Sequence, residues 1–170
     1  MLKTQLLTAV VLAGLASNQA AAEPFTPTIT VTVDGWPNPV VHGTTNLPDG
    51  TVYTSGVRGI VHGGHFSEPL RHDGMCPLIP DHDYYVSVYV LNMLGQPLNV
   101  DKILGPLLEN TDGPFVHVDG LGTSIVYEKW FHVGPGGDHA STPLEILNTQ
   151  TNNKARFQQW KATGLRCPPG

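Results

Sequence analysis

Apolar and polar residues alternate strictly over 28–33, which predicts a strand with one buried face. Ile29, Val31 and Val33 fall on one side, and three threonines fall on the other. This two-residue period is typical of a sheet that packs one face on a core and turns the other to water. We therefore expect a half-buried strand early in the folded chain.

A second run, over 84–91, is apolar on both sides. Val86, Val88 and Val90 share one face, while Tyr85 and Tyr89 lie on the other. A strand with two apolar faces is covered on both, so this segment is predicted to be the central strand of its sheet.

Pro48, Asp49 and Gly50 suit a tight turn, because proline presets φ, aspartate bonds its own backbone and glycine tolerates positive φ. Apolar runs flank this turn at 40–45 and 51–57, so we expect a hairpin. A second pair of strands, 115–118 and 123–132, is separated by a turn at 119–120.

Gly63 and Gly64 predict a further hairpin, of the primed two-residue type, between 57–62 and 65–67. In that register the predicted cross-strand pairs are His62 with His65, Val61 with Phe66, and Ile60 with Ser67. Val61 and Phe66 would then point at the core, and both histidines would point to water.

The C-terminal part is predicted to hold a last strand over 143–147 and a short helix over 152–163. Thr151 is a suitable N-cap and Gly164 a suitable stop. Phe157 and Trp160 share one face of this helix and would dock on the sheets. The fold class is therefore mostly β: an antiparallel, immunoglobulin-like sandwich of about seven short strands with one short C-terminal helix.

The first 22 residues have the pattern of a secretory signal peptide. Lys3 precedes an apolar run over 6–16, and Ala20 and Ala22 supply a small-x-small cleavage site. The apolar run is too short to span a bilayer, so we expect cleavage after Ala22 and no stable membrane anchor. The remaining residues, 23–170, would form one periplasmic or secreted domain.

Charge narrows the possible partners. The formal net charge is −5, and loss of Lys3 with the leader would take it to −6. Nucleic acids and anionic membranes need a basic footprint, which this chain lacks. The expected partner is a protein or a small ligand that the sequence does not identify.

A resemblance supports the same class. The string Thr-Asn-Leu-Pro-Asp-Gly-Thr at 45–51, the tyrosine-rich strand and a later Gln-Pro-x-x-Val at 96–100 resemble motifs of a group of small exported bacterial β-sandwich proteins. The resemblance spans roughly 28–165. It implies the fold and export, and it implies no activity, because the group has no assigned one.

Catalytic motifs are missing from the sequence: it holds neither a Gly-x-Ser-x-Gly elbow nor a phosphate-binding glycine loop. Asp81, His82 and Asp83 could form an acid–base cluster, but their place before the central strand favours a solvated turn. The chain is therefore expected to be non-enzymatic, with a binding or structural accessory role and no cofactor.

The histidines of this chain suggest a metal-binding function as an alternative. Four of the eight histidines lie between 62 and 82, and residues that flank a two-residue turn face each other about 5 Å apart. His62 and His65 could therefore share a zinc or copper(II) ion, with His72 and His82 as further ligands. Two other readings stay open: a patch that responds to pH, and surface histidines without a role.

Cys76 and Cys167 are the only cysteines, and an even count in an exported chain predicts one disulfide, with a reactive or metal-binding thiol as the alternative. The bridge would close a loop of about 91 residues and stabilise the fold by about 4 kcal/mol in the chain-entropy account. Cys167→Ser should therefore lower the melting temperature markedly and expose one titratable thiol, as measured by calorimetry and thiol labelling. Two reactive thiols in the exported wild-type protein would contradict the bridge.

Overall fold

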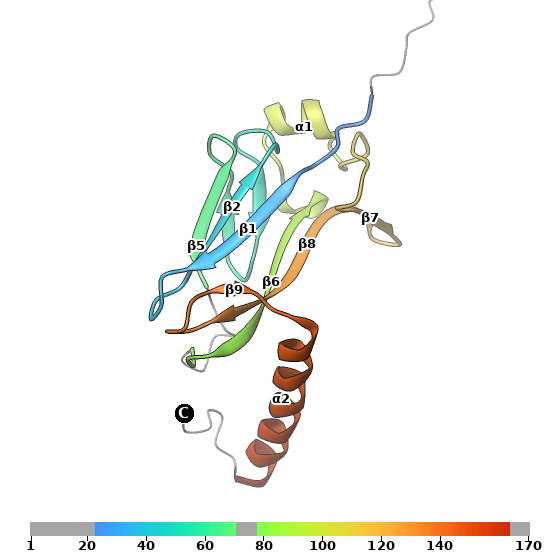
Figure 1. Ribbon diagram of the computed structural model, residues 1–170. Helices are drawn as coiled ribbons and strands as arrows, with labels where there is room; N and C mark the ends of the chain where they lie inside the picture. Colours follow the sequence, from blue (N-terminus) through green and yellow to red (C-terminus); the bar gives the residue numbers. More distant parts are fainter. Residues whose placement is uncertain (1–22, 71–77, 164–170) are drawn as a thin grey trace, which may run out of the picture.

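The computed structural model describes residues 23–70 and 78–163 (Figure 1). Within these ranges the chain forms nine strands, two α helices and one turn of 3-10 helix. The strands are β1 Ile29–Asp34, β2 Val40–Thr45, β3 Val52–Thr54, β4 Arg58–Ile60, β5 His65–Pro69, β6 His82–Leu91, β7 Val116–Asp119, β8 Gly122–Val133 and β9 His139–Ala140. The helices are η1 Asn92–Leu94, α1 Leu98–Leu104 and α2 Pro143–Thr163. The predicted leader (1–22), His72, Cys76 and Cys167 lie outside the described residues.

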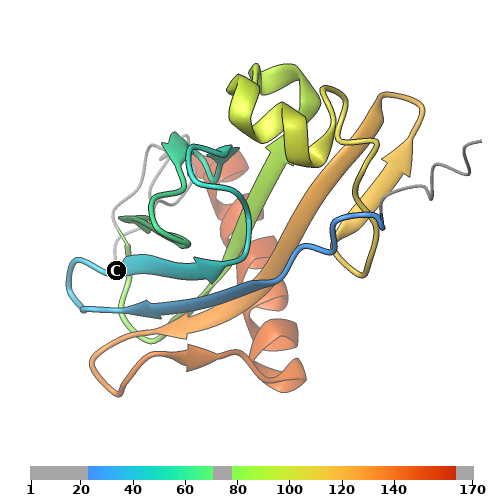
Figure 2. The ribbon, with the colours of Figure 1, turned by 90° about the horizontal axis from the view of Figure 1, so that it is seen from above.

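The strands form two antiparallel sheets. One has the order β1-β2-β5, and the other has the order β4-β3-β6-β8-β7, with β9 also paired to β8. Seen from above, β1 and β2 cross over β6 and β8, while α2 lies on the far side of β6 and β8 (Figure 2). The mostly-β, antiparallel prediction is confirmed.

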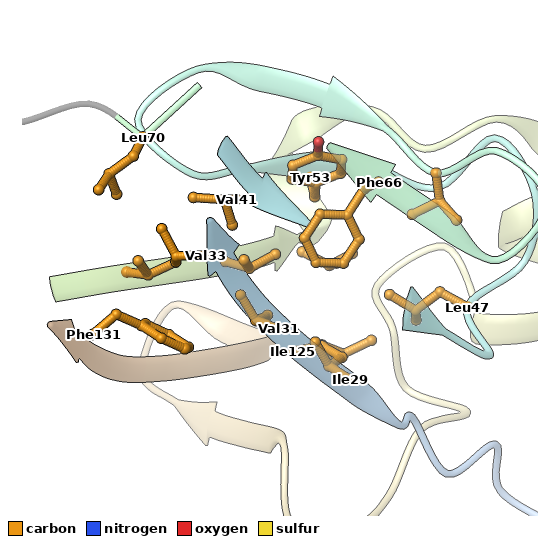
Figure 3. Close-up of a cluster of buried hydrophobic side chains, with 14 of the residues drawn as sticks. Ile29, Val31, Val33, Val41, Leu47, Tyr53, Phe66, Leu70, Ile125 and Phe131 are labelled. Carbon is orange, nitrogen blue, oxygen red and sulfur yellow. The ribbon is translucent and has the colours of Figure 1, made fainter. Parts of the chain in front are cut away.

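The two sheets share one hydrophobic core (Figure 3). The alternating residues of β1 face this core as predicted: Ile29, Val31 and Val33 are buried, and the threonines between them are exposed. The second sheet contributes Ile125 and Phe131 from β8. The core also holds the three predicted valines of β6, which is indeed central between β3 and β8. The hairpin over 115–132 is confirmed as β7 and β8.

The predicted hairpin between 40–45 and 51–57 is wrong. β2 pairs with β1 and β5, whereas β3 pairs with β4 and β6, so the turn at 46–51 carries the chain from one sheet to the other. Leu47 is buried in the core, and the Asn46 side chain bonds the backbone of Thr26 and Thr28. These contacts fold the turn across the end of the two sheets, which prevents its flanking strands from pairing.

Two side chains from the segment after β6 hold this crossing in place. Gln96 accepts a hydrogen bond from the Val52 N–H at 2.8 Å and donates one to the Val52 carbonyl at 2.9 Å, as a neighbouring strand would. Asn99 donates to the Asp49 carbonyl at 2.8 Å. Val100 is fully buried. The structure therefore brings the two motifs at 45–51 and 96–100 into direct contact.

The C-terminal prediction needs two corrections. The segment 143–147 is not a strand but the first part of α2, and the chain has a longer C-terminal helix and a second α helix, α1. Thr142 caps α2: its hydroxyl accepts from the Glu145 N–H, and the Glu145 carboxylate accepts from the Thr142 N–H. Thr151, the predicted cap, lies inside the helix and donates to the Leu147 carbonyl. The side chains of Phe157 and Trp160 lie outside the described part.

Gln96 provides a test of this architecture. Gln96→Ala should destabilise the protein by about 1–3 kcal/mol, because the amide and carbonyl of the buried Val52 would lose their partners. Gln96→Glu keeps an acceptor for the Val52 N–H but sets a carboxylate oxygen against the Val52 carbonyl, so it should destabilise the protein as well. Chemical denaturation measures both. Gln150→Ala, on the exposed surface of α2, is the control and should stay within about 0.5 kcal/mol; an equal effect there would contradict the role of Gln96.

Candidate functional site

The outer face of the β1-β2-β5 sheet carries an ordered set of polar side chains. Strand alternation sends these residues outward, and the register aligns them in rows across the sheet. One row holds Thr30, Thr44 and His65, and the next holds Thr32, His42 and Ser67. This sheet therefore presents hydroxyls and imidazoles, together with the methyl groups of the threonines, in these two rows.

These rows form the floor of an open groove with a volume of about 460 Å³. We call it the histidine groove; its lining residues are Thr30, Thr32, His42, Gly43, Thr44, Ile60, His62, His65, Phe66 and Ser67. Gly43 is required beneath it, because a Cβ at this position would lie within 1.9 Å of the Phe66 ring. The groove therefore combines three imidazoles with four hydroxyls in one concave surface.

His62 and His65 flank the predicted two-residue turn. Each donates its backbone N–H to the carbonyl of the other, at 2.9 and 3.0 Å. Gly63 and Gly64 have φ of +56° and +76°, the left-handed values of a type I′ turn. The turn prediction is confirmed, and both histidine side chains are exposed, with 77% of the His62 side chain open to water.

The predicted pairing beyond this turn is wrong. Phe66 pairs with Gly43, Ser67 pairs with His42, and Ile60 pairs with Val52 of the other sheet. The two arms separate because β4 and β5 belong to different sheets. Val61 and Phe66 are nevertheless buried, as the pattern predicted.

His82 does not join the other histidines. It begins β6 and pairs with Val133, while Tyr89, seven residues further along β6, lies beside Thr54. At about 3.3 Å per residue, these seven residues place His82 more than 20 Å from Thr54. Thr54 belongs to β3, which pairs with β4, the strand just before His62. Within 23–70 and 78–163, no three histidine, cysteine or acidic side chains are placed to hold a metal ion.

His42 was not among the predicted site residues, and its neighbours form a Ser–His–Asp arrangement. Ser67 Oγ lies 3.2 Å from His42 Nδ1, and His42 Nε2 lies 3.4 Å from Asp34 Oδ1. The ring is reversed relative to a serine-protease triad, in which the carboxylate holds Nδ1. The alternation of β2 could have indicated an exposed His42, but its neighbours depend on the strand order.

In the described part of the chain, this arrangement lacks the surroundings that activate a nucleophile. The His42 and Asp34 side chains are 47% and 66% exposed, so water competes for their contacts. Backbone N–H groups of strands lie in the plane of the sheet, so none of those in β1, β2 and β5 points above Ser67, where an oxyanion would form. The geometry is suited to holding polar ligand groups by hydrogen bonds.

A second polar cluster lies where α2 begins. Asp83 was predicted to sit in a solvated turn, but it is 5% exposed, and its two oxygens accept hydrogen bonds from Ser141 (2.5 Å) and Thr149 (2.6 Å). His132 Nδ1 lies 3.4 Å from the same carboxylate. Asp83 is buried because β9 and α2 fold over this end of β6. This cluster fastens α2 to the sheet.

The first turn of α2 adds a second attachment. Glu145 accepts hydrogen bonds from Thr142 and lies 3.1 Å from Nε2 of His139. The bonds from Thr142, followed by the contact with His139, lower the pKa of Glu145 to about 2. The bond to Glu145 is also the main cause that raises the pKa of His139.

Comparison with known proteins does not assign this chain to a family. No protein-family model matches it, and neither a curated protein nor a solved structure is significantly similar. In the described ranges, neither α1 nor α2 is both long enough and apolar enough to cross a membrane.

The lowered pKa of Glu145 predicts an acid-sensitive helix start. The ionised carboxylate stabilises the fold fully above its ordinary pKa of 4.5, and this contribution is lost as the pH falls towards about 2. Glu145→Gln should therefore reduce the pH dependence of unfolding between about 4.5 and 2, as measured by thermal melts. Glu23→Gln removes an exposed carboxylate elsewhere and should leave the wild-type slope. An unchanged slope in Glu145→Gln would contradict this assignment.

Proposed function

We propose that this protein is exported after cleavage at Ala22 and works by binding, as a non-enzymatic accessory protein of the periplasm or the secreted fraction. The leader pattern of residues 1–22 and the acidic charge support export of a chain without nucleic-acid or anionic-membrane partners. The exposed, weakly organised surroundings of Ser67 argue for binding over hydrolysis.

The fold proposed for this role is an immunoglobulin-like sandwich. The order β1-β2-β5 matches strands A, B and E of that fold, and β3-β6-β8 matches strands C, F and G, with β4 as an added edge strand. Tyr84, near the start of β6, accepts a hydrogen bond from the Ile79 N–H at 2.6 Å and donates to the Ile79 carbonyl at 3.1 Å. A tyrosine that bonds backward at this place corresponds to the tyrosine corner of immunoglobulin-like domains.

The observation that carries the binding proposal is the histidine groove. Its three imidazoles and four hydroxyls line one concave surface, where all but His62 are aligned in register on neighbouring strands. Each hydroxyl can donate and accept, and each neutral imidazole can do both with its two nitrogens. Such a surface suits a polar small ligand or a polar segment of a partner protein.

A zinc or copper(II) ion at His62 and His65 is the second candidate. It is favoured by the type I′ turn, which holds both exposed imidazoles beside one groove. These metals need a third and usually a fourth ligand. Of the two further ligands predicted, His82 lies at the far end of β6 and His72 lies outside the described residues.

Protein purified from the native periplasm tests both candidates. We expect native mass spectrometry to find a bound ligand that is lost in His42→Ala and His65→Ala and kept in His117→Ala, which removes an exposed histidine from β7. All three substitutions should leave the free energy of unfolding within about 0.5 kcal/mol of wild type, because these side chains are exposed.

Elemental analysis of the same sample separates the candidates. Stoichiometric zinc or copper that disappears in both His62→Ala and His65→Ala would favour the metal site. A metal-free protein that still carries a ligand would favour the first proposal. If the His42→Ala and His65→Ala variants keep every adduct of the wild type, the groove is not the binding site.

A further inference from the structure

The outer face of the other sheet, along β6 and β8, carries a second and chemically different surface. Cross-strand pairing places Tyr85 beside Trp130, Ser87 beside Glu128, and Tyr89 beside Val126. Tyr85 is 45% exposed, Glu128 is exposed, and Trp130 is only partly buried. Large aromatic side chains are usually covered, so their exposure on a flat sheet face needs a reason.

The two rings at this face lie in contact. The ring centroids of Tyr85 and Trp130 are 5.3 Å apart, with an angle of 50° between their planes. Together these rings form a short aromatic platform on the outer face of the sheet, the face on which α2 also lies. A planar or cationic group can stack on such a platform, and tryptophan is the best of the aromatic residues at attracting a cation.

Glu128 stands next to the platform in a fixed position. Tyr89 donates its hydroxyl to Glu128 Oε1 at 2.5 Å, and the Tyr85 hydroxyl also hydrogen-bonds to this carboxylate. These two bonds lower the pKa of Glu128, so the carboxylate is ionised at neutral pH. An ionised carboxylate has about four acceptor positions, so two remain for a ligand.

Charge selects the kind of partner. The chain has a net charge of −5, and the neighbouring Lys129 belongs to the opposite side of β8, where its Nζ lies 5.8 Å above the Phe131 ring. An anionic ligand would therefore meet repulsion at this face. A guanidinium group fits it, because it is planar, stacks on aromatic rings and offers two parallel donors to a carboxylate.

We propose that the face formed by Tyr85, Tyr89, Glu128 and Trp130 docks an arginine side chain of a basic partner protein. The guanidinium stacks on the Tyr85–Trp130 platform and donates to the two remaining acceptor positions of Glu128. This docking face is separate from the histidine groove and does not depend on a ligand there.

Two synthetic peptides of equal charge test the proposal: one alternates arginine with serine over eight residues, and the other has lysine in place of arginine. We expect the mature protein to bind the arginine peptide about tenfold more tightly by calorimetry, because lysine lacks the planar fork. In nitrogen–proton correlation spectra, the arginine peptide should shift the indole N–H signal of Trp130.

The variants separate docking from general charge attraction. Tyr85→Ala and Glu128→Gln should each weaken arginine binding about tenfold, and Tyr85→Phe, which keeps the ring, should weaken it less. Asp101→Asn removes one negative charge from α1 instead and should change affinity less than twofold. Near-ultraviolet circular dichroism checks that each variant keeps its fold.

Three outcomes would overturn the proposal. Equal affinity for both peptides, or equal losses in Glu128→Gln and Asp101→Asn, would mean that only net charge attracts the peptide. Binding of a neutral oligosaccharide such as chitohexaose at Trp130, without binding of the arginine peptide, would assign the platform to glycans. Loss of histidine-groove binding leaves this result unaffected, since the two surfaces lie on different sheets.

Discussion

The pairing of the Gln96 side chain with the Val52 backbone is the interaction on which the arrangement of the two sheets depends. A chain that crosses between sheets must leave backbone groups without a strand partner at the crossing, and buried groups of this kind are costly. Gln96 supplies a donor and an acceptor at that point. With Asn99 on the carbonyl of Asp49, the segment after β6 fixes where β2 ends and where β3 begins.

The histidine groove follows from the same constraint. The fixed turn presents Asp49, whose carboxylate accepts the Gly63 N–H at 2.6 Å, and Gly50, which donates to the Val61 carbonyl. These bonds hold the Gly63–Gly64 turn against the crossing and set His62 at the rim of the groove. At the opposite end of the sheets, Asp83 holds α2 in place in a similar way. Its carboxylate accepts hydrogen bonds from the hydroxyls of Ser141, which follows β9, and Thr149 of α2.

Local pattern predicted the strands well and their partners poorly. The alternation over 28–33, 84–91 and 115–132 is a property of each segment alone, so β1, β6 and the β7–β8 pair could be found. The hairpin over 40–57 failed because its outcome depends on Gln96, 44 positions from Val52. The start of α2 was missed because the Thr142–Glu145 capping box was read as part of a strand. In the groove, His62 and His65 were predictable from the glycine turn, whereas His42 with Ser67 required the strand order.

In the Gly63–Gly64 turn, folding and ligand binding depend on different atoms: the backbone closes the turn, and the side chains face the groove. Backbone bonds between His62 and His65 and glycine φ angles close it, so the turn itself does not require histidine side chains at 62 and 65. Selection can therefore exchange these side chains freely while the sheets stay in register. This tip is a position where relatives of this protein could acquire different binding preferences without a loss of stability.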